Sequence, residues 1–212
     1  MRVTVFGATG KIGRLVVDQL PAQGHHVVAF ARSPGKPQRT DPHLTVIGGE
    51  LSDTDAVARA VARSDAVISA LGPSLKRSTP AGPLAAGTRT IVEAMENAGI
   101  SRIIALATPS LPDPRDGRHW KHSVLPVMAG LAFPNALTEL RGMTEAITGS
   151  GLDYTIARIT NPTDKPATGR IRAGYLGHDK VGSTMSRADI AAFMVGQLAD
   201  TRHSRSMPAI SN

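Results

Sequence analysis

The sequence begins MRVTVFGATGKIGRLVVDQL (residues 1–20), in which an apolar run, a glycine-rich turn and a helix-like stretch follow one another directly. RVTVF (2–6) is apolar and rich in β-branched residues, as is typical of a buried strand. KIGRLVVDQL (11–20) has apolar residues at helical spacing. The sequence therefore predicts a strand and a helix joined by a tight turn over 7–13.

The three glycines of this turn are spaced as a bound dinucleotide requires. Gly7 allows a sharp turn at the strand end, Gly10 lets a diphosphate approach the backbone, and Gly13 allows the helix to pack closely on the sheet. The first helical turn presents unpaired N–H groups and a partial positive charge to phosphates. A glycine-rich turn alone is weakly specific, but its place between the first strand and the first helix supports dinucleotide binding. The residues expected to bind the cofactor here are Gly7, Ala8, Thr9, Gly10, Lys11, Ile12 and Gly13.

Strand-like and helix-like segments alternate along the rest of the chain. Strands are expected at 2–6, 26–31, 44–47, 65–71, 102–107 and 153–158, and helices at 11–20, 52–62, 88–99, 135–151 and 186–200. Two helices begin with capping-box spacing, Ser52 with Asp55 and Ser186 with Asp189. This alternation predicts right-handed crossovers and a parallel sheet. We therefore expect an α/β fold: a single Rossmann-like, doubly wound parallel sheet with helices on both faces and a small C-terminal substrate region.

The composition is that of one globular domain spanning residues 1–212. Hydrophobic residues make up 41% of the chain and charged residues 19%. Cysteine is absent, which excludes disulfides, thiolate nucleophiles and zinc–thiolate sites. No segment has the pattern of a signal peptide, and none reaches the roughly 20 apolar residues that cross a bilayer. We expect a cytoplasmic protein that does not enter a membrane.

The chain carries a formal net charge of +7, from 24 Lys and Arg against 17 Asp and Glu. Such an excess can indicate nucleic-acid binding. Here, however, the basic residues are scattered and aromatic residues make up only 3% of the chain, so few bases could be stacked. Attraction of an anionic small molecule explains the charge equally well, and nucleic acid is not the expected partner.

Three motifs carry a resemblance to a known superfamily. GATGKIG (7–13), ARS (31–33) and SGLDYTIAR (150–158) are similar to the atypical short-chain dehydrogenase/reductase superfamily, over nearly the whole chain. More narrowly, they resemble its small NAD(P)H-binding branch, which includes flavin and biliverdin-IXβ reductases and the NmrA-like redox sensors. GATGxxG is specific for the superfamily, whereas none of the motifs is specific for a substrate. The resemblance implies a Rossmann-like domain that binds a nicotinamide dinucleotide.

The end of the second predicted strand indicates which nicotinamide cofactor is bound. NAD sites tend to carry an acidic residue about 20 positions beyond the glycines, on the ribose hydroxyls. This chain has Arg32 and Ser33 there instead. A guanidinium and a hydroxyl bind a 2′-phosphate that a carboxylate would repel, and Lys11 adds a second positive charge. We therefore expect NADP rather than NAD.

The resemblance implies further residues at the cofactor. Glu50 and Leu51 stand where the family contacts adenine, although the family usually has Asp in the place of Glu50. The segment ALG (70–72) is similar to the one beside the ribose and nicotinamide, and its small residues permit close approach. The backbone at Arg158 borders the nicotinamide end of the cleft, although Ile159 stands where proline is common. The residues so implied are Glu50, Leu51, Ala70, Leu71, Gly72 and Arg158.

The catalytic pair of the better-known branch of the superfamily, a Tyr followed four residues later by Lys, is absent. Tyr154 is followed by Arg158, and Tyr175 by Asp179. Hydride transfer must then depend on the cofactor and on positioning, which suits a planar, electron-poor, conjugated acceptor. Relatives carry a hydroxyl residue near the nicotinamide ring at the end of the fifth strand. By resemblance, Thr108 is the first candidate for a catalytic and cofactor-contacting role, and Ser110 the second.

The one long irregular segment, 108–134, holds five of the fifteen prolines and is expected to form a loop or lid on the substrate side. Within it, Trp120 could stack on a flat substrate. His119 and His122 have a spacing that metal ligands use, but no third ligand is indicated, so no metal is expected. A solvated surface loop is the competing interpretation.

Together these features predict an NADPH-dependent oxidoreductase that transfers hydride to a flavin, quinone or polycyclic aromatic compound. Two alternatives keep the cofactor. An NmrA-like sensor would bind NADP(H) without turnover, and an isomerase, epimerase or dehydratase would return the hydride to the same substrate. The chain would act as a monomer or homodimer on a small molecule.

Overall fold

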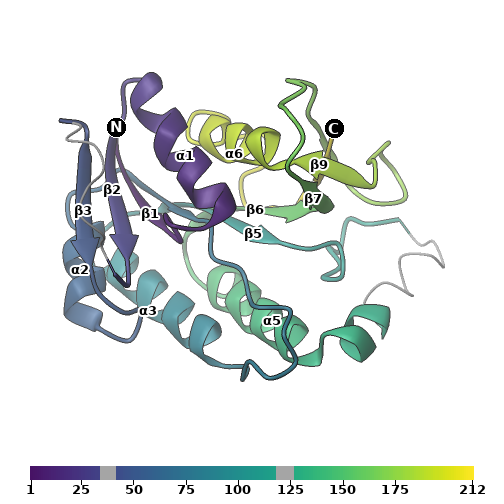
Figure 1. The fold of residues 1–212 in the computed structure, drawn as a ribbon, viewed down its shortest axis with the longest axis horizontal. Coiled ribbons are helices and arrows are strands. Elements are labelled where there is room, and N and C mark those ends of the chain that lie inside the picture. The colour runs from purple at the N-terminus through teal and green to yellow at the C-terminus, as the bar shows by residue number, and fades with distance from the viewer. Residues whose placement is uncertain (34–41, 118–126) are drawn as a thin grey trace.

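The computed structural model describes residues 1–33, 42–117 and 127–212 (Figure 1). Eight strands in these ranges form one sheet. Their spatial order is β3-β2-β1-β4-β5-β6-β10-β8, and among these pairings only β10 with β8 is antiparallel. The strands are β1 (Arg2–Phe6), β2 (His26–Ala31), β3 (Leu44–Gly48), β4 (Ala66–Ser69), β5 (Arg102–Ala107), β6 (Asp153–Ile159), β8 (Arg172–Gly174) and β10 (Ala209–Ser211). The predicted α/β fold is confirmed, and the predicted parallel sheet is parallel except at the edge strand β8.

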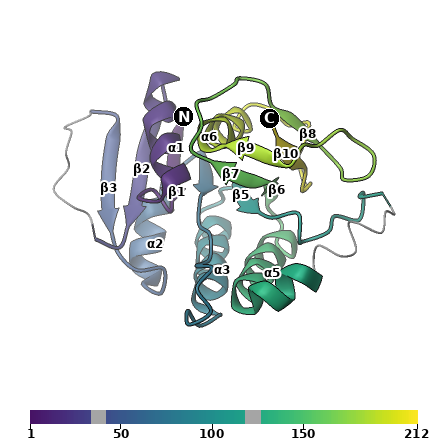
Figure 2. The same cartoon turned by 45° about the vertical axis from the view of Figure 1, so that its right-hand side comes forward.

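Helices cover both faces of the sheet (Figures 1 and 2). On one face lie α1 (Lys11–Ala22) and α6 (Arg187–Gly196). On the other lie α2 (Thr54–Val61), α3 (Pro83–Asn97) and α5 (Pro134–Thr148). The sheet is therefore doubly wound, as the alternation of strands and helices predicts.

The central strands bury their side chains on both faces. Along β5, Ile103 packs into the core beneath α2, α3 and α5, whereas Ile104 packs into the core beneath α1 and α6. Val28 and Ala29 of β2 divide between the same two cores. Each isoleucine is fully buried and contributes roughly 1.5–3 kcal/mol. Burial on both faces explains why these strands are continuous apolar runs.

Helix caps fix where two of the predicted helices begin. The Ser186 Oγ of α6 accepts from the Asp189 N–H at 3.0 Å, as the capping-box spacing predicts. In α2 the cap is Asp53, which accepts from the Ala56 N–H at 2.9 Å, and Ser52 does not cap the helix. A carboxylate one residue closer to the helix replaces the predicted hydroxyl.

The third helix starts earlier than the sequence pattern predicts, at Pro83 instead of residue 88. The Glu139 carboxylate of α5 accepts from the N–H groups of Leu84 and Ala85, at 3.1 and 2.7 Å. This buried carboxylate satisfies donors of the first helical turn from a distant part of the chain. Local sequence therefore does not reveal this cap.

The C-terminal third adds short strands that the sequence pattern does not predict. β7 (Asn161–Thr163) and β9 (Thr184–Ser186) pair in parallel as a separate two-stranded sheet, and β10 enters the main sheet beside β6. Within the segment predicted to be irregular, residues 127–132 are helical. No helix in the described part of the chain has the length and apolar character of a membrane span.

Candidate nucleotide-binding site

The turn after β1 depends on glycine at two positions. Gly7 has a φ of +75°, and a Cβ there would lie 2.8 Å from the carbonyl carbon and oxygen of Ala70. A Cβ on Gly13 would lie 2.0 Å from the Gly7 oxygen. Glycine is therefore needed at position 13 because the Gly7 carbonyl lies against the start of α1. The sequence argument instead located this close packing between the helix and the sheet.

The N-terminus of α1 is open. Gly10 is its N-cap and supplies no side-chain hydrogen bond, and the Gly10 N–H donates to the Gly7 oxygen at 2.9 Å. The N–H groups of Lys11, Ile12 and Gly13 donate to no residue that the structure describes. Three unpaired donors and the positive end of the helix dipole therefore face the same space. This arrangement suits a phosphate group.

The turn lies where the strand order of the sheet reverses direction. β1 pairs with β2 on one side and with β4 on the other, so the crossovers from β1 and from β3 leave in opposite directions. Ala70 follows β4, and its N–H donates to the Phe6 oxygen at 2.9 Å. The Leu71 nitrogen also lies beside Gly7, 3.0 Å from where a Cβ on Gly7 would be, and Gly72 follows it in the chain. Open α/β sheets bind ligands at such a crossover, at the carboxyl ends of the strands.

Arg32 and Ser33 follow β2 at the same edge. The register pairs Phe6 of β1 with Phe30 of β2, so Arg32 lies two residues beyond the level at which β1 ends. Both side chains are exposed. Arg32 makes no hydrogen bond or ion pair with another residue in the described ranges. No described residue therefore competes with an anion for this guanidinium.

The two residues after β3 have different surroundings. Leu51 is half-buried against α3, where a Cβ on Gly87 would lie 2.5 Å from the Leu51 Cβ. Glu50 is exposed, with Oε2 3.5 Å from the Ser52 Oγ. Leu51 is therefore fixed by packing, while the Glu50 carboxylate remains accessible.

The two predicted hydroxyl residues follow β5. Thr108 and Ser110 are both half-buried, and the Thr108 oxygen accepts from the Leu111 N–H at 3.0 Å. This hydrogen bond closes a turn at the carboxyl end of the strand, two strands from β1. Neither hydroxyl has a hydrogen-bond partner among the described residues.

The Arg158 side chain turns into the protein interior, while the contact of its backbone with the cofactor stays a prediction. Its side chain is fully buried, with Nε donating to the Met207 oxygen at 2.6 Å and Nη1 to the Leu111 oxygen at 3.1 Å. Both Nη atoms also donate to the Asp116 carboxylate, at 2.5 and 2.7 Å. Burial opposes ionisation of Asp116, yet the hydrogen bonds and charge of Arg158, together with backbone hydrogen bonds from Asp113 and Leu176, outweigh it, and the pKa of Asp116 is lowered. Arg158 therefore fixes the segment after β5 in place.

A charged cluster beside the turn was not predicted. The Asp164 carboxylate lies 3.1 Å from the Lys11 Nζ and 2.6 Å from an Arg187 Nη. The hydrogen bond from Lys11, with the nearby charges, lowers the pKa of Asp164. The cluster joins the starts of α1 and α6 to the loop after β7. Its members are too far apart in sequence for any local pattern to reveal it.

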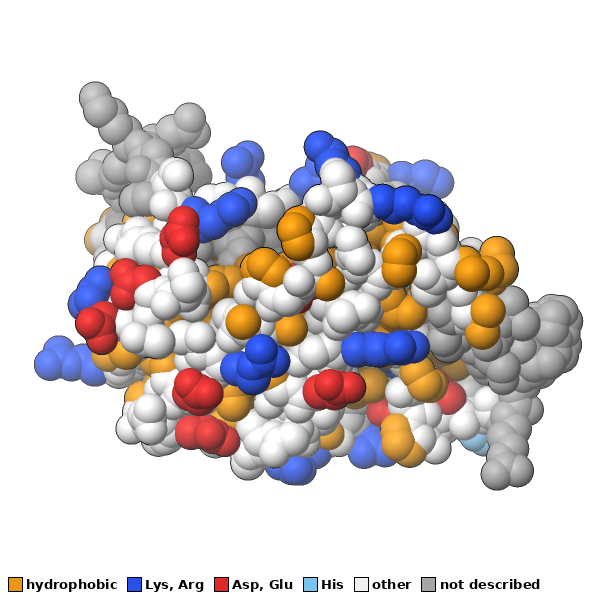
Figure 3. Space-filling view, turned by 90° about the horizontal axis from the view of Figure 1, so that it is seen from below, with side chains coloured by type: hydrophobic (Ala, Val, Ile, Leu, Met, Phe, Trp, Pro, Cys, Tyr) orange, Lys and Arg blue, Asp and Glu red, His pale blue; other side chains and the backbone are white. Residues whose placement is uncertain are grey.

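The remaining candidates of the irregular segment, His119, Trp120, Lys121 and His122, lie outside the described residues. The short helix that follows exposes apolar side chains. Figure 3 shows the molecule from below, with hydrophobic side chains gathered near the right edge, beside the grey residues on that side. The most exposed large ones in this part of the chain are Val127, Met128, Leu131 and Phe133.

A glycine turn with open N–H groups at a parallel-sheet crossover defines a Rossmann-type dinucleotide-binding protein. Comparison with protein families agrees, since the NAD(P)H-binding family model matches residues 7–201. The chain belongs to the NAD(P)H-binding family.

Solved structures share this fold over the whole chain. The anaerobillin reductase ChuY from Escherichia coli O157:H7 superposes with a TM-score of 0.78 at 25% identity, covering 100% of this chain and 97% of that one. A short-chain dehydrogenase/reductase from Veillonella parvula, in complex with NADP, has a TM-score of 0.74 at 21% identity, covering 100% and 94%.

Among curated proteins, the photosystem II assembly factor Ycf39 of Synechocystis is 27% identical over 166 residues, which are 75% of this chain and 44% of that protein. The chain spans less than half the length of each of the first curated relatives it matches, between 24% and 44%.

Proposed function

We propose that the protein is an NADPH-dependent reductase that transfers hydride to a planar conjugated acceptor such as a flavin, a quinone or a polycyclic aromatic compound. The observation that carries the proposal is the open N-terminus of α1 at the β1/β4 crossover, with an exposed arginine beyond β2 that has no partner among the described residues. Family membership and similarity to a reductase over 97% of that protein's length support it.

The residues of the turn have distinct roles in this proposal. The N–H groups of Lys11, Ile12 and Gly13 hold the diphosphate, and Gly10 leaves room for it. Arg32 and Ser33 bind the 2′-phosphate, because the exposed guanidinium has no competing partner among the described residues. Three further residues line the sheet edge along the nucleotide: Leu51, Ala70 and Leu71.

In this proposal, hydride transfer proceeds without a Tyr–Lys acid pair. A nicotinamide supplies a hydride when it is bound, and the acceptor also gains a proton from solvent or a nearby hydroxyl. No Tyr–Lys pair is present in the sequence to protonate a carbonyl. Thr108 and Ser110, whose hydroxyls have no partner in the described part of the chain, are the groups that could donate a hydrogen bond to the acceptor. Positioning of a reactive acceptor then supplies most of the acceleration.

The acceptor would lie on the carboxyl side of β5, beside the described parts of the segment 108–134, which are 108–117 and 127–134. The buried Arg158–Asp116 pair anchors the first part of this segment. Val127, Met128 and Leu131 expose apolar surface on the helix at its other end. A flat apolar acceptor fits such surroundings better than a small polar ketone does.

The absence of the Tyr–Lys pair also favours one second candidate, a sensor that binds NADP(H) without turnover. An acceptor screen separates the two. NADPH oxidation is followed at 340 nm with FMN, menadione, phenanthrenequinone and biliverdin, and a control reaction uses acetone. We expect turnover with at least one conjugated acceptor and none with acetone. Tight NADPH binding without oxidation by any acceptor would reject the reductase in favour of the sensor.

A further inference from the structure

An exposed carboxylate beside the glycine turn is shared by two cationic side chains. The Asp164 Oδ2 lies 3.1 Å from the Lys11 Nζ, and the Asp164 Oδ1 accepts from an Arg187 Nη at 2.6 Å. Lys11 is the first residue of α1, and Arg187 is the first residue of α6. Because one carboxylate faces two cations, the cluster retains an excess positive charge.

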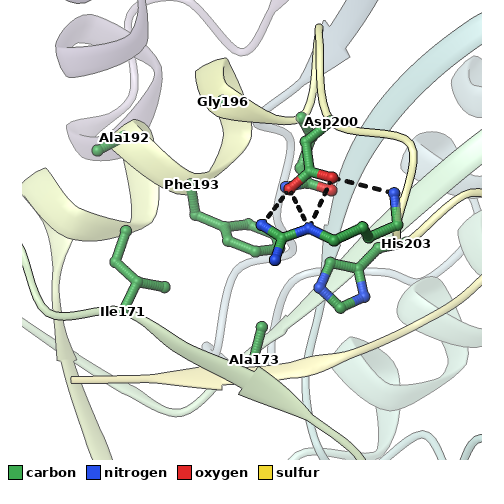
Figure 4. A pocket seen from close by; sticks show the side chains of 9 residues that line it. Ile171, Ala173, Ala192, Phe193, Gly196, Asp200 and His203 are labelled. Carbon is green, nitrogen blue, oxygen red and sulfur yellow. Dashed lines mark hydrogen bonds and ion pairs between the residues drawn. The ribbon is translucent and has the colours of Figure 1, made fainter.

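The other ion pairs among the described residues join one acid to one base. Asp200, for example, pairs with Arg202 at 2.7 Å, and that pair is neutral (Figure 4). Exposed ion pairs add little to folding stability. An unbalanced cation beside the proposed phosphate-binding turn is therefore better explained by an anionic ligand than by stability.

The loop that carries Asp164 is held against α6, which lies beside α1 (Figure 1). The buried Asp189 carboxylate of α6 accepts from the N–H groups of Thr168 and Gly169 in this loop, at 2.8 and 3.0 Å. The Arg187 side chain is only 19% exposed, so much of its conformational freedom is already lost. Arg187 therefore needs little further ordering to bind a ligand.

A phosphate group can take the place of the Asp164 carboxylate. Both groups are anionic and offer several acceptor oxygens, and lysine and arginine bind phosphate through charge-assisted hydrogen bonds. Asp164 is 67% exposed and lies in a loop, so its side chain can rotate into solvent. The carboxylate thus marks a position at which two cations already hold an anion.

The strand order indicates which phosphate belongs at this position. Arg32, the proposed partner of the 2′-phosphate, follows β2 on one side of β1. Asp164 follows β7, which comes directly after β6 on the other side of β1. With the adenosine half of the cofactor directed toward β2, the position between Lys11 and Arg187 is on the nicotinamide side.

We propose that Lys11 and Arg187 bind the phosphate on the nicotinamide side of the cofactor diphosphate, and that Asp164 occupies this position when no cofactor is bound. The inference rests on the proposed binding of NADPH and does not depend on turnover. It adds Arg187, from the C-terminal part of the chain, to the groups of α1 that hold the diphosphate.

Three ligands test the contact by calorimetric titration: NADPH, NADH and adenosine 2′,5′-bisphosphate, which lacks the nicotinamide-side phosphate. Arg187→Gln should weaken NADPH and NADH by about five- to twenty-fold each at low salt, because both contain the diphosphate. The bisphosphate should bind this variant with wild-type affinity, which also shows that the variant folds. Arg170→Gln, an exposed arginine of the same loop, is the matched control and should bind all three ligands as the wild type does.

Two further variants separate a direct contact from an indirect one. If Arg187 only neutralises Asp164, Arg187→Gln should have no effect in the Asp164→Asn background. We expect NADPH to be weakened about three-fold or more in that background. Arg187→Lys, which keeps the charge, should retain most of the affinity for both dinucleotides.

The outcomes distinguish this inference from the proposed function. Wild-type affinity of Arg187→Gln for both dinucleotides, no effect in the Asp164→Asn background, or equal weakening of all three ligands would overturn the Arg187 contact alone. Failure of the wild-type protein to bind any of the three ligands would overturn the proposed function together with it.

Discussion

The Lys11 Nζ lies 3.1 Å from the Asp164 carboxylate, although 153 positions separate the two residues in the chain. Lys11 opens α1 beside the phosphate-binding N–H groups, and Asp164 follows β7. Asp164 therefore places a negative charge beside the proposed diphosphate site and also engages a lysine that could contact the diphosphate. Both side chains are well exposed.

Replacing Asp164 by Asn should strengthen NADPH binding. The change removes the repulsion of a carboxylate and releases Lys11 toward the phosphates, and a gain of about two- to five-fold in affinity is expected at low salt. The gain should shrink at 0.5 M salt because exposed charges are screened. Calorimetric titration at both salt concentrations measures it. Asp18→Asn, an exposed carboxylate further along α1, is the matched control and should leave the affinity unchanged.

Replacing Arg32 by Ala should distinguish the two nicotinamide cofactors. The loss of charged hydrogen bonds to a 2′-phosphate should weaken NADPH by about 1.5–3 kcal/mol and leave NADH nearly unaffected. Dissociation constants of both cofactors, measured by fluorescence, give the comparison. Arg59→Ala, an exposed arginine at the end of α2, serves as the control. Equal weakening of NADPH and NADH would show that Arg32 does not contact the 2′-phosphate.

Replacing Gly13 by Ala should damage the fold of the turn itself. The added Cβ would lie 2.0 Å from the Gly7 oxygen, which is backbone and cannot move aside cheaply. We expect a loss of about 1–3 kcal/mol in the free energy of unfolding. Gly151→Ala meets nothing within 4 Å and should be almost neutral. Urea denaturation of both variants measures the difference, and equal stabilities would contradict the geometry of the turn.

The buried Asp116–Arg158 pair should give stability a pH dependence. Asp116→Asn leaves Arg158 without its counter-charge, and about 3 kcal/mol of unfolding free energy should be lost at pH 7. Because the pKa of Asp116 is lowered in the folded protein, the contribution of its charge is complete above about pH 4. That contribution disappears as the pH falls through the folded-state pKa.

Denaturant unfolding of wild type and Asp116→Asn at pH 7, 5 and 3 tests whether the stabilisation by the Asp116 charge falls as the pH falls. The difference between the two proteins should be the same at pH 7 and 5 and smaller at pH 3. Asp18→Asn should show no such narrowing. A difference that grows as the pH falls would contradict the assignment.

Much of the sheet could be predicted from the sequence because its central strands are buried on both faces. The predicted strands 2–6, 26–31 and 102–107 coincide with β1, β2 and β5. Their apolar runs are bounded by glycine or polar residues, so both type and limits are locally encoded. The three-residue strands β7 to β10 have no such signal, because their pairing depends on distant partners.

The site could be predicted where backbone conformation is decisive and not where distant side chains meet. Gly7 and Gly13 were identified from spacing, since only glycine suits the turn. The buried pairing of Arg158 with Asp116 was missed because the two residues are 42 positions apart with no linking pattern. The cap that Glu139 of α5 provides to α3 was missed for the same reason.

The central claim is that the first turn of α1 holds the cofactor diphosphate. Titration of the ¹⁵N-labelled protein with NADPH, followed by amide shifts, tests it most directly. The largest shifts should fall on Lys11, Ile12 and Gly13, whose N–H groups are unpaired within the described structure. Saturable binding of NADPH that leaves these three amides unmoved would contradict the account.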